Sequence, residues 1–521
     1  FVIIALVSIE AASAWGRLGH EIVIAVAQRH LTEKTKAEIA KYAPYDLKED
    51  AVWMDDFRKT EPIGFTTHWH TAYFDENHHY NPFYLRKTRT GDVVRALDIV
   101  DNALANGRYR HLSDEAVQFS IRMLVHFVGD LHCPTHTNVP ESTCKNDCEF
   151  RGKVYTFHSV YDRMPNFIWE KTPADEVAEK IDNASKRERK AIVKGDKIEW
   201  LNTMIKDNVQ IYEWNAPYVE VLREDTVELS TDLVNKQMRD AGYRLAFLLN
   251  TYFGKQQGKA MKKSLLLIIL SLMSYEVISA WGRLGHETVI AVAQRYLTKK
   301  TKEELAKYVP YDLKKDAVWM DEFRHTDPIA FTTNWHTCYF DENMHYNPFK
   351  VRKMETGDLV RSLDLADNAL ANGRYKHLSD EAVLFSIRIL IHFVGDLHCP
   401  THTNLPISSG KSPCTLNGRE LTYHSVYDKM PNFIWGKTPA DEIAEKIDNA
   451  SRRERKALVK GDVVDWLNAM IKDNAKIFDW NPPKTEVMRD DTVELSTDLV
   501  NKQMRDAGYR LAFLLNTYFG K

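Results

Sequence analysis

The sequence predicts a mainly α-helical domain that occurs twice in the chain, and three observations carry this prediction. Apolar residues recur at three-to-four spacing over much of each copy, which is the period of a helix. Long runs that alternate apolar and polar residues, as half-buried strands do, are scarce. Residues 15–255 recur as residues 281–521 at a constant offset of 266, without a gap. That period is far too long for a solenoid, and 241 residues can bury a core of their own, so we interpret the repeat as a duplicated domain.

Helical spacing of apolar residues marks seven segments of the first copy. They are 18–30, 32–42, 91–105, 113–132, 174–190, 197–212 and 227–252. The fourth segment has clear boundaries, because Ser113 precedes two acidic residues at its start and Pro134 stops it. Segments 62–84 and 137–157 are rich in proline, asparagine, threonine and aromatic residues, so we expect loops there with a short hairpin.

The composition excludes several classes of protein. Among 521 residues, 44% are hydrophobic and 27% are charged, which excludes wholesale disorder. Lys and Arg number 70 against 73 Asp and Glu, a net charge of −3, so tight non-specific wrapping of duplex nucleic acid is not expected. Six cysteines are too few for a disulfide-dense scaffold.

An apolar leader precedes each copy. Residues 261–280 begin with Met261 and two lysines, continue with an apolar run and end in Ile-Ser-Ala, as a secretory signal peptide does. Residues 1–14 resemble the tail of another such peptide, ending in Ala-Ser-Ala. A buried core helix or a short membrane anchor are the alternatives, but the run is short for a membrane span. We therefore expect a secreted protein, in which an internal signal suggests two joined reading frames.

These features give the expected organisation of the chain. It comprises a partial signal peptide (1–14), the first domain (15–255), a linker with a signal-like segment (256–280) and the second domain (281–521). The sequence does not fix whether both domains form one mature polypeptide.

Histidine and aspartate residues form the most informative pattern. His126 and Asp130 are four residues apart and project from one helix face, and His136 follows the helix-ending proline. His158 and Asp162 form a second pair with the same spacing, and His20, Asp55 and His70 lie upstream. Imidazole nitrogen with carboxylate oxygen suits zinc, and Asp130 has two oxygens with which to bridge two ions. Neighbouring divalent ions are the usual device for hydrolysing phosphoesters.

The alternative is that these histidines are packed or hydrogen-bonded core residues, but two such pairs with His136 favour a metal site. His132 lies two residues from Asp130 and faces away from the pair, so a structural or supporting role is expected for it. Three further histidines, His30, His68 and His78, are replaced in the second copy by Tyr296, Asn334 and Met344, which counts against them as ligands.

The order of motifs resembles that of a known family. Each copy has a tryptophan at the expected cleavage site, then Trp-Gly-x-x-Gly-His, Trp-x-Asp-x-x-Arg, His-Phe-Val-Gly-Asp-x-His-x-Pro-x-His and His-x-x-x-Asp. This set is similar to the zinc-dependent single-strand-specific nucleases and 3′-nucleotidases of the S-one/P-one class, with which zinc phospholipases C share a helical fold. The resemblance spans each copy nearly end to end.

The resemblance implies three zinc ions per domain. One would use Asp55, His70, His126 and Asp130; a second would use His136, His158 and Asp162; the third would use His20, Asp130 and the amino nitrogen and carbonyl oxygen of mature Trp15. Asp55 and Arg58 would be catalytic, with Arg58 on the phosphate. The matching residues of the second copy are Trp281, His286, Asp321, Arg324, His336, His392, Asp396, His402, His424 and Asp428.

Cysteines and sequons add expectations that depend on secretion. Cys133 and Cys148 recur as Cys399 and Cys414, and we expect each pair to form a disulfide, the alternative being buried thiols. Cys144 and Cys338 have no counterparts. Asn183 and Asn449 begin Asn-Ala-Ser sequons in polar stretches and are expected glycosylation sites.

The function that we expect is a secreted zinc endonuclease that hydrolyses RNA and single-stranded DNA and removes 3′-phosphate from nucleotides, without stable membrane association. A zinc phospholipase C and a non-enzymatic secreted zinc-binding protein are the alternatives. Base preference stays open, because Thr71 follows His70 where the family often has an aromatic residue. Tyr73, Phe74 or Tyr155 could stack a base instead. The sequence gives no indication of oligomeric state.

Overall fold

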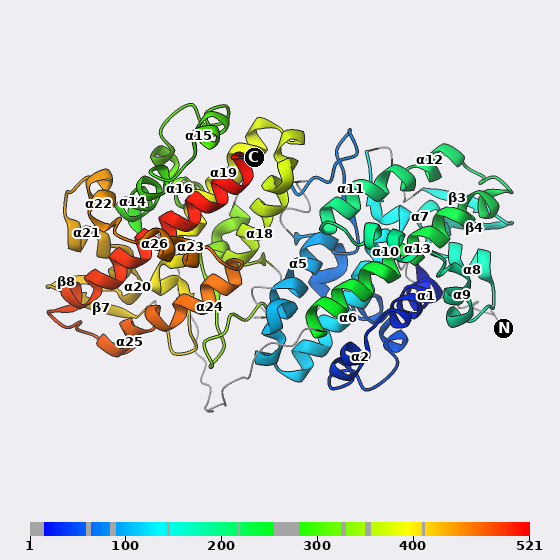
Figure 1. Ribbon diagram of the computed structural model, residues 1–521, viewed down its shortest axis with the longest axis horizontal. Coiled ribbons are helices and arrows are strands. Elements are labelled where there is room, and N and C mark those ends of the chain that lie inside the picture. Colours follow the sequence, from blue (N-terminus) through cyan, green and yellow to red (C-terminus); the bar gives the residue numbers. More distant parts are fainter. Residues whose placement is uncertain are drawn as a thin grey trace, which may run out of the picture. The chain divides into compact units, whose positions relative to one another are not determined.

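The computed structural model divides into two compact units, residues 1–259 and 260–521, which we describe separately (Figure 1). It describes residues 15–58, 64–83, 90–140, 142, 146–216, 219–254, 281–324, 330–349, 356–408 and 412–521. Both expected leaders, 1–14 and 256–280, lie outside the described residues.

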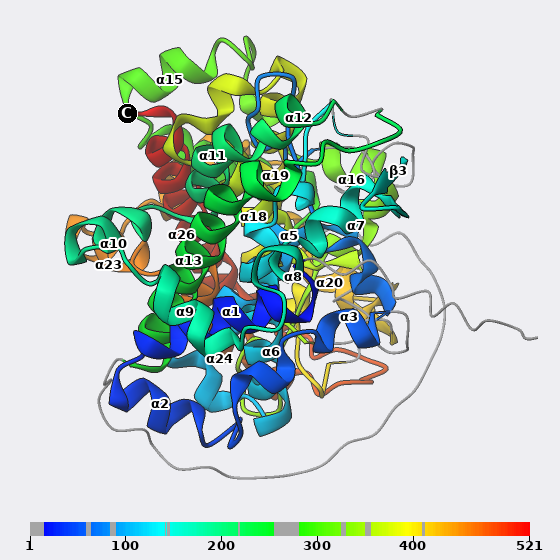
Figure 2. The same cartoon turned by 90° about the vertical axis from the view of Figure 1, so that its right-hand side faces the viewer.

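Three helices form the framework of the first unit: α1 (Gly16–Arg29), α6 (Asp114–His132) and α13 (Thr226–Phe253). The long α13 packs against both α1 and α6, as Figures 1 and 2 show. A β-carbon on Gly242 of α13 would lie 2.5 Å from a side-chain carbon of Val26 on α1. This glycine therefore lets the two helices approach closely. Helix α5 (Val93–Leu104) covers another side of α6.

Helix α6 begins and ends where the sequence predicts. The Ser113 hydroxyl accepts a hydrogen bond from the backbone N–H of Ala116 at 3.3 Å, which satisfies one unpaired donor of the first turn. The helix ends before Pro134, which begins the 3₁₀ turn η4 (Pro134–His136). The prediction of a mainly helical domain is confirmed.

Two predicted helices are each split in two. Segment 174–190 forms α9 (Ala174–Ile181) and α10 (Lys186–Ile192), because Ser185 and Glu188 make a capping box that starts a new helix. Segment 197–212 forms α11 (Lys197–Asn208) and α12 (Gln210–Trp214). Predicting one helix for each segment was therefore wrong.

Short elements connect these helices. The helical ones are α2 (Glu33–Ile39), η1 (Leu47–Asp50), α3 (Trp53–Phe57), η2 (Gly64–His68), η3 (Ala105–His111), α7 (Phe157–Asp162) and α8 (Met164–Trp169). Strands β1 (Ala72–Tyr73) and β2 (Thr137–Asn138) pair in parallel. Strands β3 (Asp147–Phe150) and β4 (Lys153–Thr156) form the expected antiparallel hairpin.

The second unit has the same elements in the same order. Its helices are α14 (Gly282–Gln294), α15 (Lys299–Leu305), η5 (Leu313–Asp316), α16 (Trp319–Phe323), η6 (Ala330–His336), α18 (Leu359–Leu370), η7 (Ala371–His377), α19 (Asp380–His398), η8 (Pro400–His402), α20 (Tyr423–Asp428), α21 (Met430–Trp435), α22 (Ala440–Ile447), α23 (Arg452–Leu458), α24 (Val463–Asn474), α25 (Lys476–Trp480) and α26 (Thr492–Phe519). Its strands are β5 (Cys338–Tyr339), β6 (Thr403–Asn404), β7 (Pro413–Leu416) and β8 (Arg419–Thr422). Among the described residues of either unit, every helix is too short or too polar to cross a bilayer.

Candidate metal centre

Buried histidine and aspartate side chains from several elements meet in the interior of each unit. In the first unit they come from α1, α3, the segment after η2, α6, η4 and α7, and they are His20, Asp55, His70, His126, Asp130, His136, His158 and Asp162. His158 is the most exposed of these side chains, at 20%. These residues are spread from position 20 to position 162 of the sequence. The packing of the helices therefore positions the site.

The first cluster surrounds one carboxylate oxygen of Asp130. Its Oδ2 lies 2.7 Å from Nδ1 of His70 and 3.2 Å from Nε2 of His126. Asp55 faces the same point, because its Oδ1 lies 3.6 Å from Nδ1 of His70 and its Oδ2 lies 3.7 Å from Nε2 of His126. Two nitrogens and two carboxylates therefore converge on one small volume.

The second cluster joins η4 to α7. Nε2 of His136 lies 3.0 Å from Nε2 of His158 and 3.8 Å from Oδ1 of Asp162. Nε2 of His158 lies 3.3 Å from the other oxygen of Asp162. These three residues thus present two nitrogens and a carboxylate to one another.

The third group lies on the other side of Asp130. Its Oδ1 is 3.3 Å from Nε2 of His20, whereas its Oδ2 faces His70 and His126. A β-carbon on Gly129 would lie 2.5 Å from Nδ1 of His20, so glycine is required where α6 passes this imidazole. Trp15 is buried at the start of α1, and its backbone lies beside the thiol of Cys133. The single carboxylate of Asp130 therefore connects two groups of donors.

Backbone carbonyls fix the tautomers of two histidines. Nδ1 of His126 donates to the carbonyl oxygen of Ala51 at 2.9 Å, and Nδ1 of His136 donates to that of His70 at 2.5 Å. A carbonyl oxygen only accepts, so Nδ1 carries a proton and Nε2 is the nitrogen that faces the cluster. This is the arrangement by which proteins orient metal-binding imidazoles.

Burial and charge shift the pKa values in the site in opposite directions. Burial lowers the pKa of His126, but the carboxylates of Asp130 and Asp55 outweigh it and raise that pKa to about 9. Burial lowers the pKa values of His20 and His136, which favours their neutral forms. Burial, followed by the charges of Asp55 and Asp130, raises the pKa of Asp162 well above its usual range. The carboxylates therefore crowd one another, and a cation among them would relieve this repulsion.

The donor set fits a divalent transition metal. Within the part of the first unit that the structure describes, Oδ1 of Asp130, Oδ2 of Asp162 and both ring nitrogens of His20 make no hydrogen bond of good geometry. Buried polar atoms in that state are costly unless a bound cation satisfies them. Clusters such as His70, His126 and Asp130 hold their ligand atoms within 4.8 Å of one another, and His286, His392 and Asp396 do the same in the second unit.

The second unit reproduces this geometry. Oδ2 of Asp396 lies 2.9 Å from Nδ1 of His336, and its Oδ1 lies 3.3 Å from Nε2 of His286. Nε2 of His424 lies 2.9 Å from Nε2 of His402. The remaining expected ligands lie in the corresponding places. His392 and Asp321 lie beside His336, and Asp428 lies beside His424. Trp281 is buried at the start of α14.

The expected phosphate-binding arginines lie at the edge of the first cluster. Nη1 of Arg58 is 3.1 Å from Oδ1 of Asp55, and Nη1 of Arg324 is 3.2 Å from Oδ1 of Asp321. Both arginine side chains are largely buried, at 12% and 5% exposed. The carboxylate thus holds each guanidinium beside the first cluster of its domain.

His132 lies outside these clusters. Its Nδ1 donates to the carbonyl oxygen of Val128 at 2.8 Å, and its Nε2 accepts a hydrogen bond from Arg244 at 2.7 Å. His132 therefore links α6 to α13.

The predicted disulfides are wrong. Cys133, Cys148, Cys399 and Cys414 are all buried free thiols. Sγ of Cys133 lies beside the second cluster, 3.4 Å from Oγ1 of Thr135 and 3.9 Å from Oδ1 of Asp162, whereas Cys148 lies on β3 opposite Tyr155. The sequence analysis did not place this thiol beside the cluster. Cys133 comes three residues before the expected ligand His136, and this spacing across the Pro134 turn could have indicated it. Cys338 is also a buried thiol, and Cys144 lies outside the described residues.

The aromatic residues considered for base stacking are only partly accessible. Phe74 is buried against Tyr80, while Tyr73 and Tyr155 are half-buried. A residue that sequence reasoning missed, Phe57, is 44% exposed immediately before Arg58, with its ring 4.8 Å from that of Trp53.

Comparison with known proteins decides the family. A family model described as S1/P1 Nuclease matches residues 15–254 and again residues 281–520. The chain belongs to the S1/P1 nuclease family. Nuclease S1 of Aspergillus oryzae is 25% identical over 189 residues, covering 34% of this chain and 66% of that protein. Nuclease P1 of Penicillium citrinum is 28% identical over 162 residues, covering 30% and 60%. Endonuclease 4 of Arabidopsis thaliana is 24% identical over 273 residues, covering 46% and 89%. The matched stretches thus span slightly less than two thirds of the two fungal nucleases.

Proposed function

We propose that each domain is a secreted, zinc-dependent nuclease that cleaves single-stranded DNA and RNA and removes 3′-phosphate from nucleotides. The observation that carries this proposal is Asp130, whose two carboxylate oxygens face two different groups of buried donors. The family match and the relatives' names support nucleic acid as the substrate.

Three zinc ions per domain would occupy these donors. Asp55, His70, His126 and Asp130 would hold one, and His136, His158 and Asp162 a second. His20 and Asp130 would hold the third together with Trp15, after cleavage has freed its amino group. When bound, such ions neutralise phosphate charge and generate hydroxide from water near neutral pH. The carbonyls of Ala51 and His70 hold Nδ1 of His126 and His136, which keeps Nε2 of both rings aimed inward.

Arg58 would bind the scissile phosphate. Nη1 of Arg58 lies 3.1 Å from Oδ1 of Asp55, beside the first cluster, and a guanidinium fork can bind two phosphate oxygens at once. A fixed positive charge there would stabilise the additional negative charge that develops in the transition state. A protein that only sequesters zinc would not need this arginine in both domains.

Preference for single strands follows from charge and stacking. With a net charge of −3, the chain does not carry the excess of cations by which proteins grip a duplex backbone. Unpaired bases can instead stack on aromatic rings, which contributes about 1–3 kcal/mol per base. The exposed rings of Phe57 and Phe323 are candidates for such stacking.

The test is to incubate the purified full chain with single-stranded RNA, a matched duplex, 3′-AMP and phosphatidylcholine, with and without a chelator. We expect chelator-sensitive cleavage of the RNA and of 3′-AMP, with the duplex cut far more slowly. Cleavage of phosphatidylcholine alone would support a phospholipase, and zinc binding without hydrolysis would support a storage protein.

A further inference from the structure

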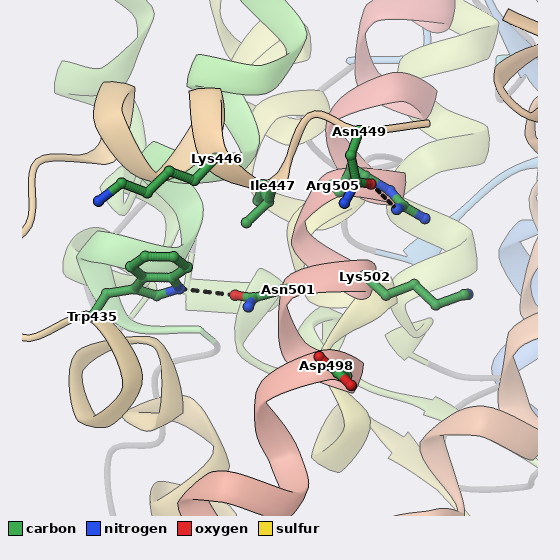
Figure 3. Close-up of a pocket in the computed structure, with 8 residues that line it drawn as sticks. All are labelled: Trp435, Lys446, Ile447, Asn449, Asp498, Asn501, Lys502 and Arg505. Carbon is green, nitrogen blue, oxygen red and sulfur yellow. Dashed lines mark hydrogen bonds between the residues drawn. The ribbon is translucent and has the colours of Figure 1, made fainter. Parts of the chain in front are cut away.

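A pocket of about 300 Å³ lies on the second domain, lined by side chains from α21, α22, α26 and the loop that begins after Ile447 (Figure 3). None of its lining residues belongs to the metal centre. It is therefore a separate feature that the proposed nuclease mechanism does not use.

The pocket has a rigid aromatic wall. Nε1 of Trp435 donates to Oδ1 of Asn501 at 2.8 Å, which fixes the indole against α26. Nζ of Lys446 lies 5.5 Å from the centre of the same ring. An aromatic face held in this way suits the apolar face of a sugar ring better than a flexible surface does.

The charges around the pocket do not favour an anion. Lys502 lies 3.1 Å from Oδ2 of Asp506 and Arg505 lies 2.9 Å from its Oδ1, so these cations have carboxylate partners. Asp498 adds a carboxylate to the lining. The lining has more cationic than acidic side chains, but Asp473 and Asp506 beside it pair with Lys502 and Arg505 and offset this excess. The mixture of donors and acceptors then matches a ligand with several hydroxyls, which is a carbohydrate.

Asn449, the first residue of a sequon, lines the same pocket and is exposed. Its Oδ1 accepts a hydrogen bond from Nη1 of Arg505 at 2.5 Å, as Figure 3 shows. Because arginine only donates, the amide oxygen must face it, and the amide nitrogen points away. An N-glycosidic bond forms at that nitrogen and leaves the oxygen as an acceptor, so the Arg505 contact survives glycosylation and orients the sugar.

The first domain repeats these contacts. Nε1 of Trp169 donates to Asn235 at 2.8 Å, Lys180 lies 5.5 Å from the Trp169 ring, and Arg239 donates to Oδ1 of Asn183 at 2.9 Å. The asparagine of each sequon therefore accepts from an arginine, and each domain has the same tryptophan held by an asparagine and a lysine.

We propose that this pocket holds the first N-acetylglucosamine of a glycan on Asn449, and that the matching residues of the first domain hold one on Asn183. The inference rests on the secretory route in the proposed function, but not on nuclease activity. In the attachment step the Asn449 nitrogen bonds to the anomeric carbon of an oligosaccharide linked to a lipid pyrophosphate. The bond from that carbon to the pyrophosphate oxygen breaks, the lipid pyrophosphate leaves, and the amide proton passes to a base of the transferase.

The experiment uses the full chain secreted from a glycosylating eukaryotic host. The native protein is treated with a peptide:N-glycosidase, which releases N-linked glycans. Peptide mass spectrometry then measures the rate of release at each asparagine. We expect Trp435→Ala to speed release at Asn449 by about tenfold, the equivalent of 1.4 kcal/mol of lost contact. Release at Asn183 in the same molecule should stay unchanged, which makes the first domain an internal control.

A second variant guards against misfolding. Asp498→Ala changes an exposed residue of the lining and should give a smaller acceleration at Asn449 only. Equal release rates at Asn449 in all three proteins, or an unmodified Asn449 in the wild type, would overturn the proposal. Hydrolysis of 3′-AMP, measured on the same samples, reports separately on the proposed function.

Discussion

Nε2 of His136 and Nε2 of His158 lie 3.0 Å apart, and the equivalent pair His402 and His424 lie 2.9 Å apart. Because Nδ1 of His136 donates to a backbone carbonyl, its Nε2 holds a lone pair that faces the other ring. Two such nitrogens at this distance need a proton or a cation between them. The carboxylate of Asp162, 3.3 Å from His158, completes a donor set typical of zinc.

Zinc should therefore stabilise the folded chain. A ligand that binds only the native state adds about 4 kcal/mol at a thousandfold excess over its Kd. For domains of this size each kcal/mol raises Tm by about 2–4 °C. Calorimetry in zinc and in a chelator should show a Tm lower by roughly 8–16 °C in the chelator. An unchanged Tm would show that no structural metal occupies these clusters.

Asp130 is the residue whose change should affect the most metal. Asp130→Asn keeps the shape of the side chain but removes the charge shared by two groups of donors. We expect zinc affinity to fall about 100-fold or more in that domain, with loss of its hydrolysis. Atomic absorption and an RNA cleavage assay on the double variant Asp130→Asn, Asp396→Asn would measure both. Full activity with unchanged zinc content would contradict the assignment.

The fold and the donor set could largely be predicted from the sequence. The pairs His126 and Asp130, and His158 and Asp162, have helical spacing, and the structure places each pair on one helix. The close approach of Asp55 and His20 to Asp130 was not predictable from spacing alone, since it depends on how α1 and α3 pack on α6. That placement came from the family resemblance.

Two features escaped sequence reasoning for physical reasons. Cysteines shared by two copies suggested disulfides, but only tertiary packing decides that Cys133 turns toward Asp162 rather than toward Cys148. The capping pattern of Ser185 and Glu188 indicates a break between α9 and α10. The apolar residues keep helical spacing across that break, and this spacing favoured a single helix.

Arg58 should affect catalysis without affecting metal content. Its Nη1 lies 3.1 Å from Oδ1 of Asp55, and its substitution removes none of the proposed zinc donors. Arg58→Met and Arg324→Met together should lower the rate of RNA cleavage about 10²–10³-fold, the usual cost of losing one donor to transition-state charge. Zinc content should match the wild type, and Arg58→Lys with Arg324→Lys should restore part of the rate. A loss of zinc in the methionine variant would instead assign the arginines a structural role.

His132 should make the folded state sensitive to mild acid. Burial, followed by the charge of Arg244, holds the pKa of His132 well below its usual range, and Arg510 does the same to His398. The unfolded chain takes up a proton near pH 6.5, whereas the folded chain does not. The stabilisation is therefore full above that pH and is lost as pH falls below it, by about 1.4 kcal/mol per pH unit and histidine.

The measurement for this prediction compares Tm between pH 7.5 and 5.5 at saturating zinc. In His132→Gln, His398→Gln the amide oxygen can accept from the arginine but no group titrates. The decline toward acid should therefore be shallower in the variant than in the wild type. The histidines of the proposed zinc sites contribute equally to both proteins, so parallel curves would contradict the prediction.

The last prediction concerns the amino group of Trp15. Trp15 is buried at the start of α1, and its backbone lies beside Cys133, whose sulfur lies 3.9 Å from Oδ1 of Asp162. In an uncleaved chain the Trp15 nitrogen is a peptide amide, and its lone pair is delocalised into the carbonyl, so it cannot bind zinc without losing its proton. A free α-amino group has an unperturbed pKa of about 8, and a metal lowers it further, which makes its lone pair available.

Two forms of residues 15–521 would test this, one beginning at Trp15 and one with an uncleavable Gly-Ser extension, both carrying Asp396→Asn to silence the second domain. We expect the extended form to bind one zinc ion fewer and to lose most of its RNA cleavage. Equal zinc content and equal rates in the two forms would show that the amino terminus is not a ligand.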